Sequence, residues 1–192
     1  MSKGLITVLV VIGVIVVFVG GFFMWGTGVY DSAIKEQENV NESFSNVQAA
    51  YQRRADLIPS LVATVKGAAE NEKGILTQVT QARAGIVGAK TPEELDRAGK
   101  QINTAINLAF EAYPQIRSTE NFQELQSQLE GTENRINVAR QRYNETVKTY
   151  NTYVRGFFKR FALNMFGGGE DFSVRKGFEA AAGADKAPEV KF

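Results

Sequence analysis

The chain has 192 residues, with 22 Lys and Arg against 21 Asp and Glu, and it contains neither cysteine nor histidine. The lack of cysteine excludes disulfides and thiolate metal sites. The lack of histidine removes the commonest acid–base group and the commonest metal ligand. A balanced charge gives no basic face for nucleic acid. We therefore expect no catalytic, cofactor or metal site and no nucleic-acid partner.

The first element is an uncharged run of 27 residues from Gly4 to Tyr30. An α-helix needs roughly 20 apolar residues to cross a bilayer, so the run predicts a transmembrane anchor over residues 1–30. A secretory signal and a buried core helix are the alternatives. The run is longer than the apolar core of a signal, and more uniformly Val, Ile and Phe than a core helix. The anchor residues include Leu5, Val11, Phe18, Phe22 and Trp25, the last at the outer end, where indole rings favour the headgroup layer.

The charges on either side of the run predict its orientation. Lys3 is the one charged side chain before it, and Asp31 begins a mixed charged stretch after it. The positive-inside bias then places the N-terminus in the cytoplasm and the rest of the chain on the other side. We expect a single-pass protein of the bacterial inner membrane, with an exported bundle and the lipid bilayer as a partner.

Residues 31–87 repeat apolar side chains every three or four positions, the pattern of an amphipathic helix. Pro59 interrupts it, either by a kink or by a fresh helix capped by Asp56. The apolar phase is unchanged across the proline, which favours a kink. Gly85 and Gly88 are then expected to weaken the helix. At 1.5 Å per residue, this segment would extend roughly 85 Å.

Two further helices follow. Residues 91–94, Thr-Pro-Glu-Glu, form a helix start with a capping box, and that helix ends at residues 113–114, Tyr-Pro, because the residue before a proline leaves helical geometry. Residues 119–166 carry the longest pattern and would return roughly 70 Å. No alternation of period two appears. The predicted fold class is all-α, in which the transmembrane helix continues into an antiparallel four-helix-type bundle over residues 31–166.

The end of the returning segment, residues 157–166, gathers aromatic side chains on one helical face and basic or polar ones elsewhere. Such a face is typical of a helix that lies in the membrane interface; the alternative is that the rings complete the core. The interfacial residues would be Phe157, Phe158, Lys159, Arg160, Phe161 and Met165. Residues 167–192 are expected to form a flexible tail, of which residues 188–192 would dock as a short extended piece.

Three asparagines recur at intervals of seven and so lie along one helix edge: Asn137, Asn144 and Asn151. A partly buried asparagine needs a hydrogen-bond partner, and at a helical seam it can set register or oligomeric state. The alternative is an ordinary bundle edge whose amides are satisfied within the chain. On the first interpretation the protein forms a homo-oligomer.

Several long motifs in consistent order resemble the bacterial LemA family. They are RRADLIPSLV at 53–62, TVKG at 64–67, FQELQ at 122–126, LEGTENRI at 129–136 and ARQRYN at 139–144. The match spans residues 31–166, and residues 190–192, Val-Lys-Phe, agree with the family as well. Asn71, where the family often has His, and Phe158, where a Pro commonly follows Phe, depart from it. The resemblance implies an N-terminal membrane helix and an antiparallel helical bundle, and it supplies no activity.

The charged residues of these motifs are interpreted as interhelical ion pairs or as cover for the helical seam. They are Arg53, Arg54, Asp56, Lys66, Glu70, Glu130, Glu133, Arg135 and Arg140. We therefore expect a non-enzymatic, membrane-anchored bundle of the bacterial envelope that acts in structure or assembly, or as an adaptor, with itself or with other membrane proteins. The alternatives are a membrane-anchored sensor or small-ligand-binding bundle, and an enzyme that uses Ser60 and Asp56.

Overall fold

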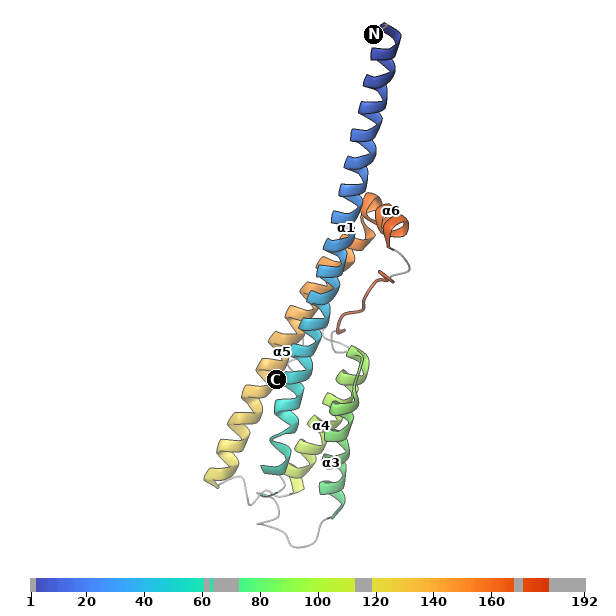
Figure 1. The fold of residues 1–192 in the computed structure, drawn as a ribbon. Coiled ribbons are helices and arrows are strands. Elements are labelled where there is room, and N and C mark those ends of the chain that lie inside the picture. Colours follow the sequence, from blue (N-terminus) through green and yellow to red (C-terminus); the bar gives the residue numbers. More distant parts are fainter. Residues whose placement is uncertain (1–2, 61–62, 64–72, 113–118, 168–170, 180–192) are drawn as a thin grey trace, which may run out of the picture. The chain divides into compact units, whose positions relative to one another are not determined.

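A computed structural model describes residues 3–60, 63, 73–112, 119–167 and 171–179. The described residues contain no strand, so the predicted all-α class is confirmed. The helices are α1 (Lys3–Ala55), α3 (Lys73–Gly88), α4 (Pro92–Ala112), α5 (Glu120–Arg155) and α6 (Phe157–Phe166) (Figure 1). The chain divides into two compact units, which we call unit 1 (residues 1–41 and 146–175) and unit 2 (residues 42–145 and 176–192).

The helix α1 ends close to the proline. Its last residue is Ala55, a turn of two residues follows, and helical geometry resumes at Ile58. Pro59 has no N–H to donate, and its ring crowds the carbonyl of Ala55. The helical ladder therefore stops there, and the Leu57 amide bonds the Arg54 carbonyl at 3.2 Å. The interruption is thus a turn with helical geometry on both sides.

The chain reverses direction after this turn. The Gln48 side chain donates to the Ala89 carbonyl at 2.9 Å, and the Arg83 guanidinium lies 3.1 Å from the Asp56 carboxylate. The end of α3 therefore lies beside the end of α1, and the single extension expected over roughly 85 Å is wrong. Instead, α3 packs on α4 (Figure 1). Helices that are consecutive in sequence commonly pack as neighbours.

The start of α4 follows the predicted capping box. The Glu94 amide donates to the Thr91 hydroxyl at 3.2 Å, and the Glu94 carboxylate accepts from the Lys90 amide at 2.8 Å. Its bounds are Pro92–Ala112, and residues 113–114, where its end is predicted, lie outside the described residues. The preceding helix, α3, continues through Gly85 to its last residue, so this glycine does not interrupt it.

Unit 2 is built around a buried apolar core. Val47 of α1 and both Leu95 and Ile102 of α4 are completely buried. Gly99 of α4 permits close packing, because the ring of Tyr51 occupies the space that a Cβ would take. The buried residues that α5 contributes are Phe122, Leu125, Leu129, Ile136 and Tyr143. All five belong to the predicted apolar seam, so the periodicity identified the buried face.

Unit 1 contains the predicted anchor. Among the described residues, α1 is the one helix that is long and apolar enough to cross a membrane, by length and composition, and its apolar stretch is not buried. The five predicted anchor side chains are all exposed on α1: Leu5, Val11, Phe18, Phe22 and Trp25. This arrangement is compatible with a membrane anchor.

The single helix expected over residues 119–166 is divided in two. The first part, α5, ends at Arg155, and α6 begins at Phe157. Between them Gly156 adopts φ −58° and ψ 130°. This ψ is extended and breaks the helical ladder. The segment of 10 residues that carries the aromatic face is therefore a helix of its own.

Candidate functional site

The helix α6 is held against the outer end of the apolar stretch of α1. The Phe166 ring lies 5.7 Å from the Phe22 ring and 5.5 Å from the Phe23 ring, centroid to centroid. Gly26 permits this approach, because Phe166 fills the space that a Cβ would take. Trp25, the predicted headgroup anchor, is the neighbouring residue. The end of α6 therefore lies beside the part of α1 at which the sequence predicts the bilayer surface.

The aromatic face of α6 is exposed. Phe157 and Phe158 are 81% and 70% exposed, and Phe161 and Met165 are each more than half exposed, at 52% and 56%. The residues that α6 buries are Ala162 and Leu163. The alternative in which the aromatic face completes the core is therefore wrong.

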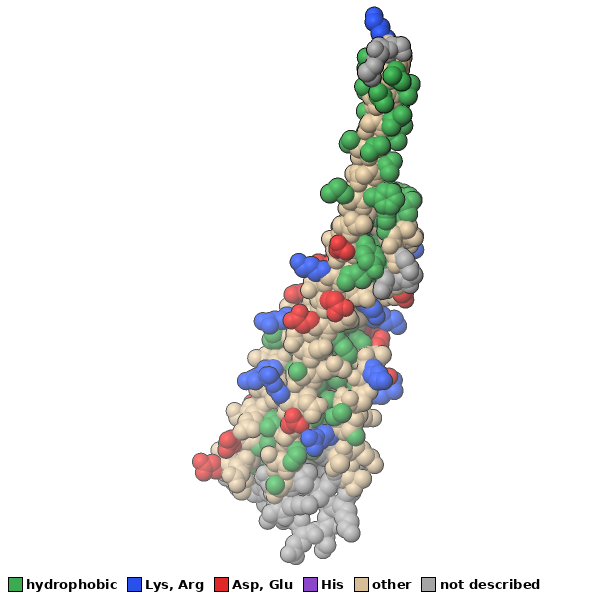
Figure 2. Space-filling view, in the orientation of Figure 1, with side chains coloured by type: hydrophobic (Ala, Val, Ile, Leu, Met, Phe, Trp, Pro, Cys, Tyr) green, Lys and Arg blue, Asp and Glu red, His purple; other side chains and the backbone are tan. Residues whose placement is uncertain are grey.

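Basic side chains lie near the start of α6. The Lys159 ammonium lies 3.9 Å from the centroid of the Tyr153 ring, a cation–π contact. The Tyr153 hydroxyl donates to the Val29 carbonyl at 3.1 Å, which attaches the end of α5 to α1. On the face drawn in Figure 2, hydrophobic side chains cover the N-terminal part of α1. Unit 1 thus combines an apolar helix, exposed rings and basic groups, as an interfacial helix requires.

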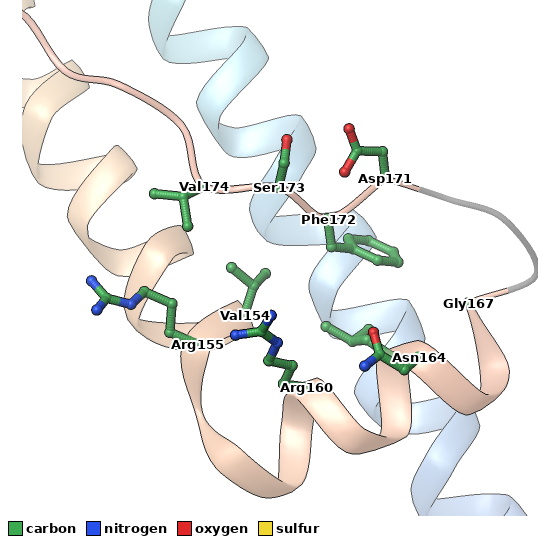
Figure 3. Close-up of a pocket in the computed structure, with 10 residues that line it drawn as sticks. Val154, Arg155, Arg160, Asn164, Gly167, Asp171, Phe172, Ser173 and Val174 are labelled. Atoms are coloured by element: carbon green, nitrogen blue, oxygen red, sulfur yellow. The ribbon is translucent and has the colours of Figure 1, made fainter.

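A cavity of about 660 Å³ lies between α6, the end of α5 and the extended segment that follows α6. Figure 3 shows Arg160 and Asn164 extending from α6 toward this segment, with Arg155 on α5 beside them. Phe172 of the segment forms part of the wall, and its ring packs edge-on against Tyr30 of α1, with centroids 5.8 Å apart. The volume is in the range of small-molecule sites, about 300–1,000 Å³.

The lining of this cavity carries two positive charges and one negative charge. These are Arg155, Arg160 and the rim residue Asp171. Neither arginine forms an ion pair with any residue that the structure describes. Both guanidinium groups are therefore available to an anionic ligand.

Residues 171–179 are extended, and in unit 1 one of the predicted asparagines binds this segment at Arg175. The Asn151 side chain donates to the Arg175 carbonyl at 2.8 Å and accepts from the Arg175 amide at 2.9 Å. Beside it, burial raises the pKa of the Tyr150 phenol, and the charge of Arg175 opposes this rise. The extended residues belong to the predicted tail, whereas residues 180–192, with the expected docking piece, lie outside the described residues.

The same pattern recurs in unit 2. The Asn144 side chain donates to the Phe178 carbonyl at 2.9 Å and accepts from the Phe178 amide at 2.7 Å. A Cβ on Gly177 would lie 2.7 Å from the Asn144 oxygen, so this position favours glycine. The buried Phe178 ring lies 5.4 Å from the Tyr143 ring and 4.8 Å from the Arg140 guanidinium. The spacing of the two asparagines on α5 matches the spacing of their partners Arg175 and Phe178. Seven residues of a helix and three residues of an extended chain each cover about 10 Å.

Asn144 and Asn151 therefore use their amides within the chain, as in the alternative of a satisfied bundle edge. Asn137 is exposed and has no hydrogen bond to a described residue. Sequence reasoning misses the partners Arg175 and Phe178, because no local pattern marks them. One signal could have indicated an extended partner: the asparagines recur every seven residues on α5, a distance that an extended chain covers in about three residues.

The charged residues of the family motifs pair across unit 2. Buried Arg54 of α1 pairs with Glu133 of α5, and Arg140 of α5 lies 3.0 Å from Asp96 of α4. Burial lowers the pKa of Arg54. These pairs agree with the interhelical role expected for the motif charges. The exposed members are Arg53, Asp56, Glu130 and Arg135, of which Asp56 pairs with Arg83, and Lys66 and Glu70 lie outside the described residues.

Comparison with known proteins agrees with these motifs. Residues 43–192 match the model of the LemA family. A related protein, Protein LemA of Metamycoplasma hominis, is 23% identical over 144 residues. That alignment covers 73% of this chain and 66% of the relative's length. The chain therefore belongs to the LemA family.

Proposed function

We propose that this protein is a membrane-anchored helical bundle of the bacterial envelope that serves in structure or assembly, or as an adaptor, without catalysing a reaction. In this proposal α1 crosses the inner membrane once, with its N-terminus in the cytoplasm, and α6 lies in the interface as a second membrane contact. The protein assembles with itself or with other membrane proteins.

The observation that carries the proposal is the exposed aromatic face of α6 beside the apolar end of α1. Removing a Phe side chain from water contributes about 1.5–3 kcal/mol, so a group of exposed rings favours a surface that covers it. Phe166 fixes α6 to Phe22 and Phe23. In this proposal the exposed rings lie near the depth of Trp25, where aromatic side chains favour the headgroup layer.

The absence of cysteine permits a direct test of this contact. The full chain, reconstituted in phospholipid vesicles, would carry one Phe158→Cys substitution labelled with an environment-sensitive fluorophore. The matched control carries the same label at Gln101→Cys, an exposed position on α4. We expect blue-shifted emission and quenching by brominated lipid at position 158 and neither effect at position 101. Equal emission at the two positions would contradict the interfacial placement of α6.

The anchor and its orientation need a separate measurement. The full chain is expected in the membrane fraction after an alkaline carbonate wash, since only spanning segments resist this extraction. In spheroplasts, an impermeant thiol reagent should label Gln101→Cys and leave Ser2→Cys, which keeps the charge of Lys3, unlabelled. The reverse labelling would contradict the proposed orientation, and release by carbonate would contradict the anchor.

The assembly proposal is supported by a groove of about 430 Å³ between α1 and α5 in unit 2. Small side chains such as Ala49 and Ala139 line part of it, together with exposed Val138 and with Arg53, Arg135 and Arg142. Small residues allow a second helix to approach closely. Native mass spectrometry of the detergent-extracted chain should show dimers or larger oligomers. A strictly monomeric species without partners would contradict assembly.

A further inference from the structure

Unit 1 contains two neighbouring hollows of opposite character. The first is the cavity of about 660 Å³ that Arg155, Arg160 and Asn164 line (Figure 3). The second is an apolar groove of about 710 Å³ between α1 and α6, lined by Phe18, Val19, Phe22, Phe23, Met165 and Phe166. Asn164 and Met165 are consecutive, so the two hollows flank the same turn of α6.

The first hollow has the donors that a phosphate group requires. Guanidinium groups bind phosphate oxygens through charge-assisted hydrogen bonds, and the Asn164 amide adds neutral donors. An anion that binds Arg155 and Arg160 would displace no ion pair of the described residues. Asp171 on the rim reduces the net positive charge to one. A phosphodiester, with a single negative charge, matches this net charge better than a phosphate dianion.

The second hollow indicates that the phosphate belongs to a lipid. Its lining is apolar, and an acyl chain would remove that lining from water. The groove reaches Phe23 on α1, whereas the polar cavity has its wall at Phe172 beside Tyr30. Seven residues of α1 separate these levels, about 10 Å along the helix. The apolar groove thus lies nearer the middle of the predicted membrane span than the polar cavity, as the acyl chains of a leaflet lie deeper than its headgroups. A free phosphate ion would occupy the polar cavity alone.

We propose that unit 1 binds one anionic phospholipid, with its phosphodiester between Arg155 and Arg160 and an acyl chain in the groove between α1 and α6. The proposal rests on the proposed function in one respect, since a bilayer lipid reaches this site only if α1 is a membrane anchor. It adds a specific ligand to a contact that would otherwise be a general affinity for the membrane surface.

The test uses the full chain in a mild detergent and counts bound lipids by native mass spectrometry. The probes are dioleoyl phosphatidylglycerol and dioleoylglycerol, which share their acyl chains and differ in the phosphodiester headgroup. Two charge-assisted contacts contribute about tenfold each. We therefore expect the first probe to bind about 100-fold more tightly. The double substitution Arg155→Gln/Arg160→Gln should remove most of this preference.

The matched control is Lys90→Gln/Lys100→Gln, which removes two exposed basic side chains of unit 2. Its preference for phosphatidylglycerol should equal that of the unchanged chain, and circular dichroism should show equal helix content in all three proteins. An equal loss in both double variants would show a general charge effect and would overturn the site.

A final arm separates the lipid from a free ion. Inorganic phosphate at millimolar concentration should leave the phosphatidylglycerol adduct in place; complete displacement would assign the cavity to a soluble anion and overturn the proposal. Equal binding of the two lipid probes would also overturn it. A chain that stays in the membrane fraction but shows no lipid preference would disprove this inference alone, whereas release from the membrane would disprove the proposed function.

Discussion

In unit 2, charged and aromatic side chains find partners inside the protein, whereas in unit 1 many of them remain exposed. The ion pairs among the described residues join members of unit 2, such as Arg54 with Glu133 and Arg140 with Asp96. In unit 1, no charged side chain forms an ion pair with a described residue. The rings of Phe157 and Phe158 are likewise exposed.

This difference in exposed and paired side chains indicates whether each unit is suited to water or to a lipid surface. A buried charge is costly unless it is paired, and in unit 2 buried Arg54 pairs with Glu133 beside the apolar core. Unit 1 leaves the rings of Phe157 and Phe158 exposed, and its Arg155 and Arg160 form no ion pair with a described residue. These groups favour lipid tails and phosphates, which a bilayer surface offers together. The two units therefore require different experiments, one of stability and the other of lipid contact.

The largest effect that would test this contrast is expected in the core of unit 2. Leu95 is fully buried, so Leu95→Ala should lower the free energy of unfolding by about 2–5 kcal/mol, through lost burial and a new cavity. Phe158→Ala, on the exposed face of α6, should change it by less than about 0.5 kcal/mol. Denaturant unfolding of the full chain in detergent, followed by circular dichroism, measures both. A loss at Phe158 as large as at Leu95 would remove the distinction between the units.

An intermediate effect is expected where the asparagines hold the extended segment. Asn144→Ala removes both hydrogen bonds to the Phe178 main chain, a loss of about 1–3 kcal/mol in local stability. The exposed bonds beyond Arg175 and Lys176 should then be cut by trypsin at least about tenfold faster. Asn137→Ala is the matched control and should leave cleavage unchanged. Faster cleavage in the control alone would contradict the assigned contacts.

The smallest effect is a pH dependence from the buried tyrosines. Burial raises the pKa of Tyr51 in unit 2 and of Tyr150 in unit 1, from a usual value of 10.0, and Arg140 and Arg175 respectively oppose this rise. As the pH rises above about 10, the tyrosines of the unfolded chain lose their protons before those of the folded chain do. Stability is therefore present in full below about pH 10 and falls as the pH rises toward the folded pKa. Unfolding midpoints near pH 8 and near pH 10.5 should differ less in Tyr51→Phe/Tyr150→Phe than in the unchanged chain; an equal difference would contradict the shifts.

Much of the fold follows from patterns that are local in the chain. The capping residues of α4 form the expected bond between Glu94 and Thr91, because a helix start depends on residues within one turn. The apolar seam of α5 marks its buried face, because helical periodicity fixes which residues share a side. Residues 157–166 form an amphipathic helix for the same reason. Local signals missed the break at Gly156, whose ψ of 130° is not specified by the apolar period.

The sequence by itself determined the all-α class, the apolar stretch of α1, the seams of the bundle and the aromatic face of α6, because each depends on side chains within a few helical turns. Only the tertiary structure decided that the chain reverses after α1 and that α6 packs against Phe22 and Phe23. It also decided that Asn151 binds Arg175 and that Asn144 binds Phe178. These contacts join residues far apart in the chain. Their partners depend on how whole helices pack, and no local spacing encodes that packing.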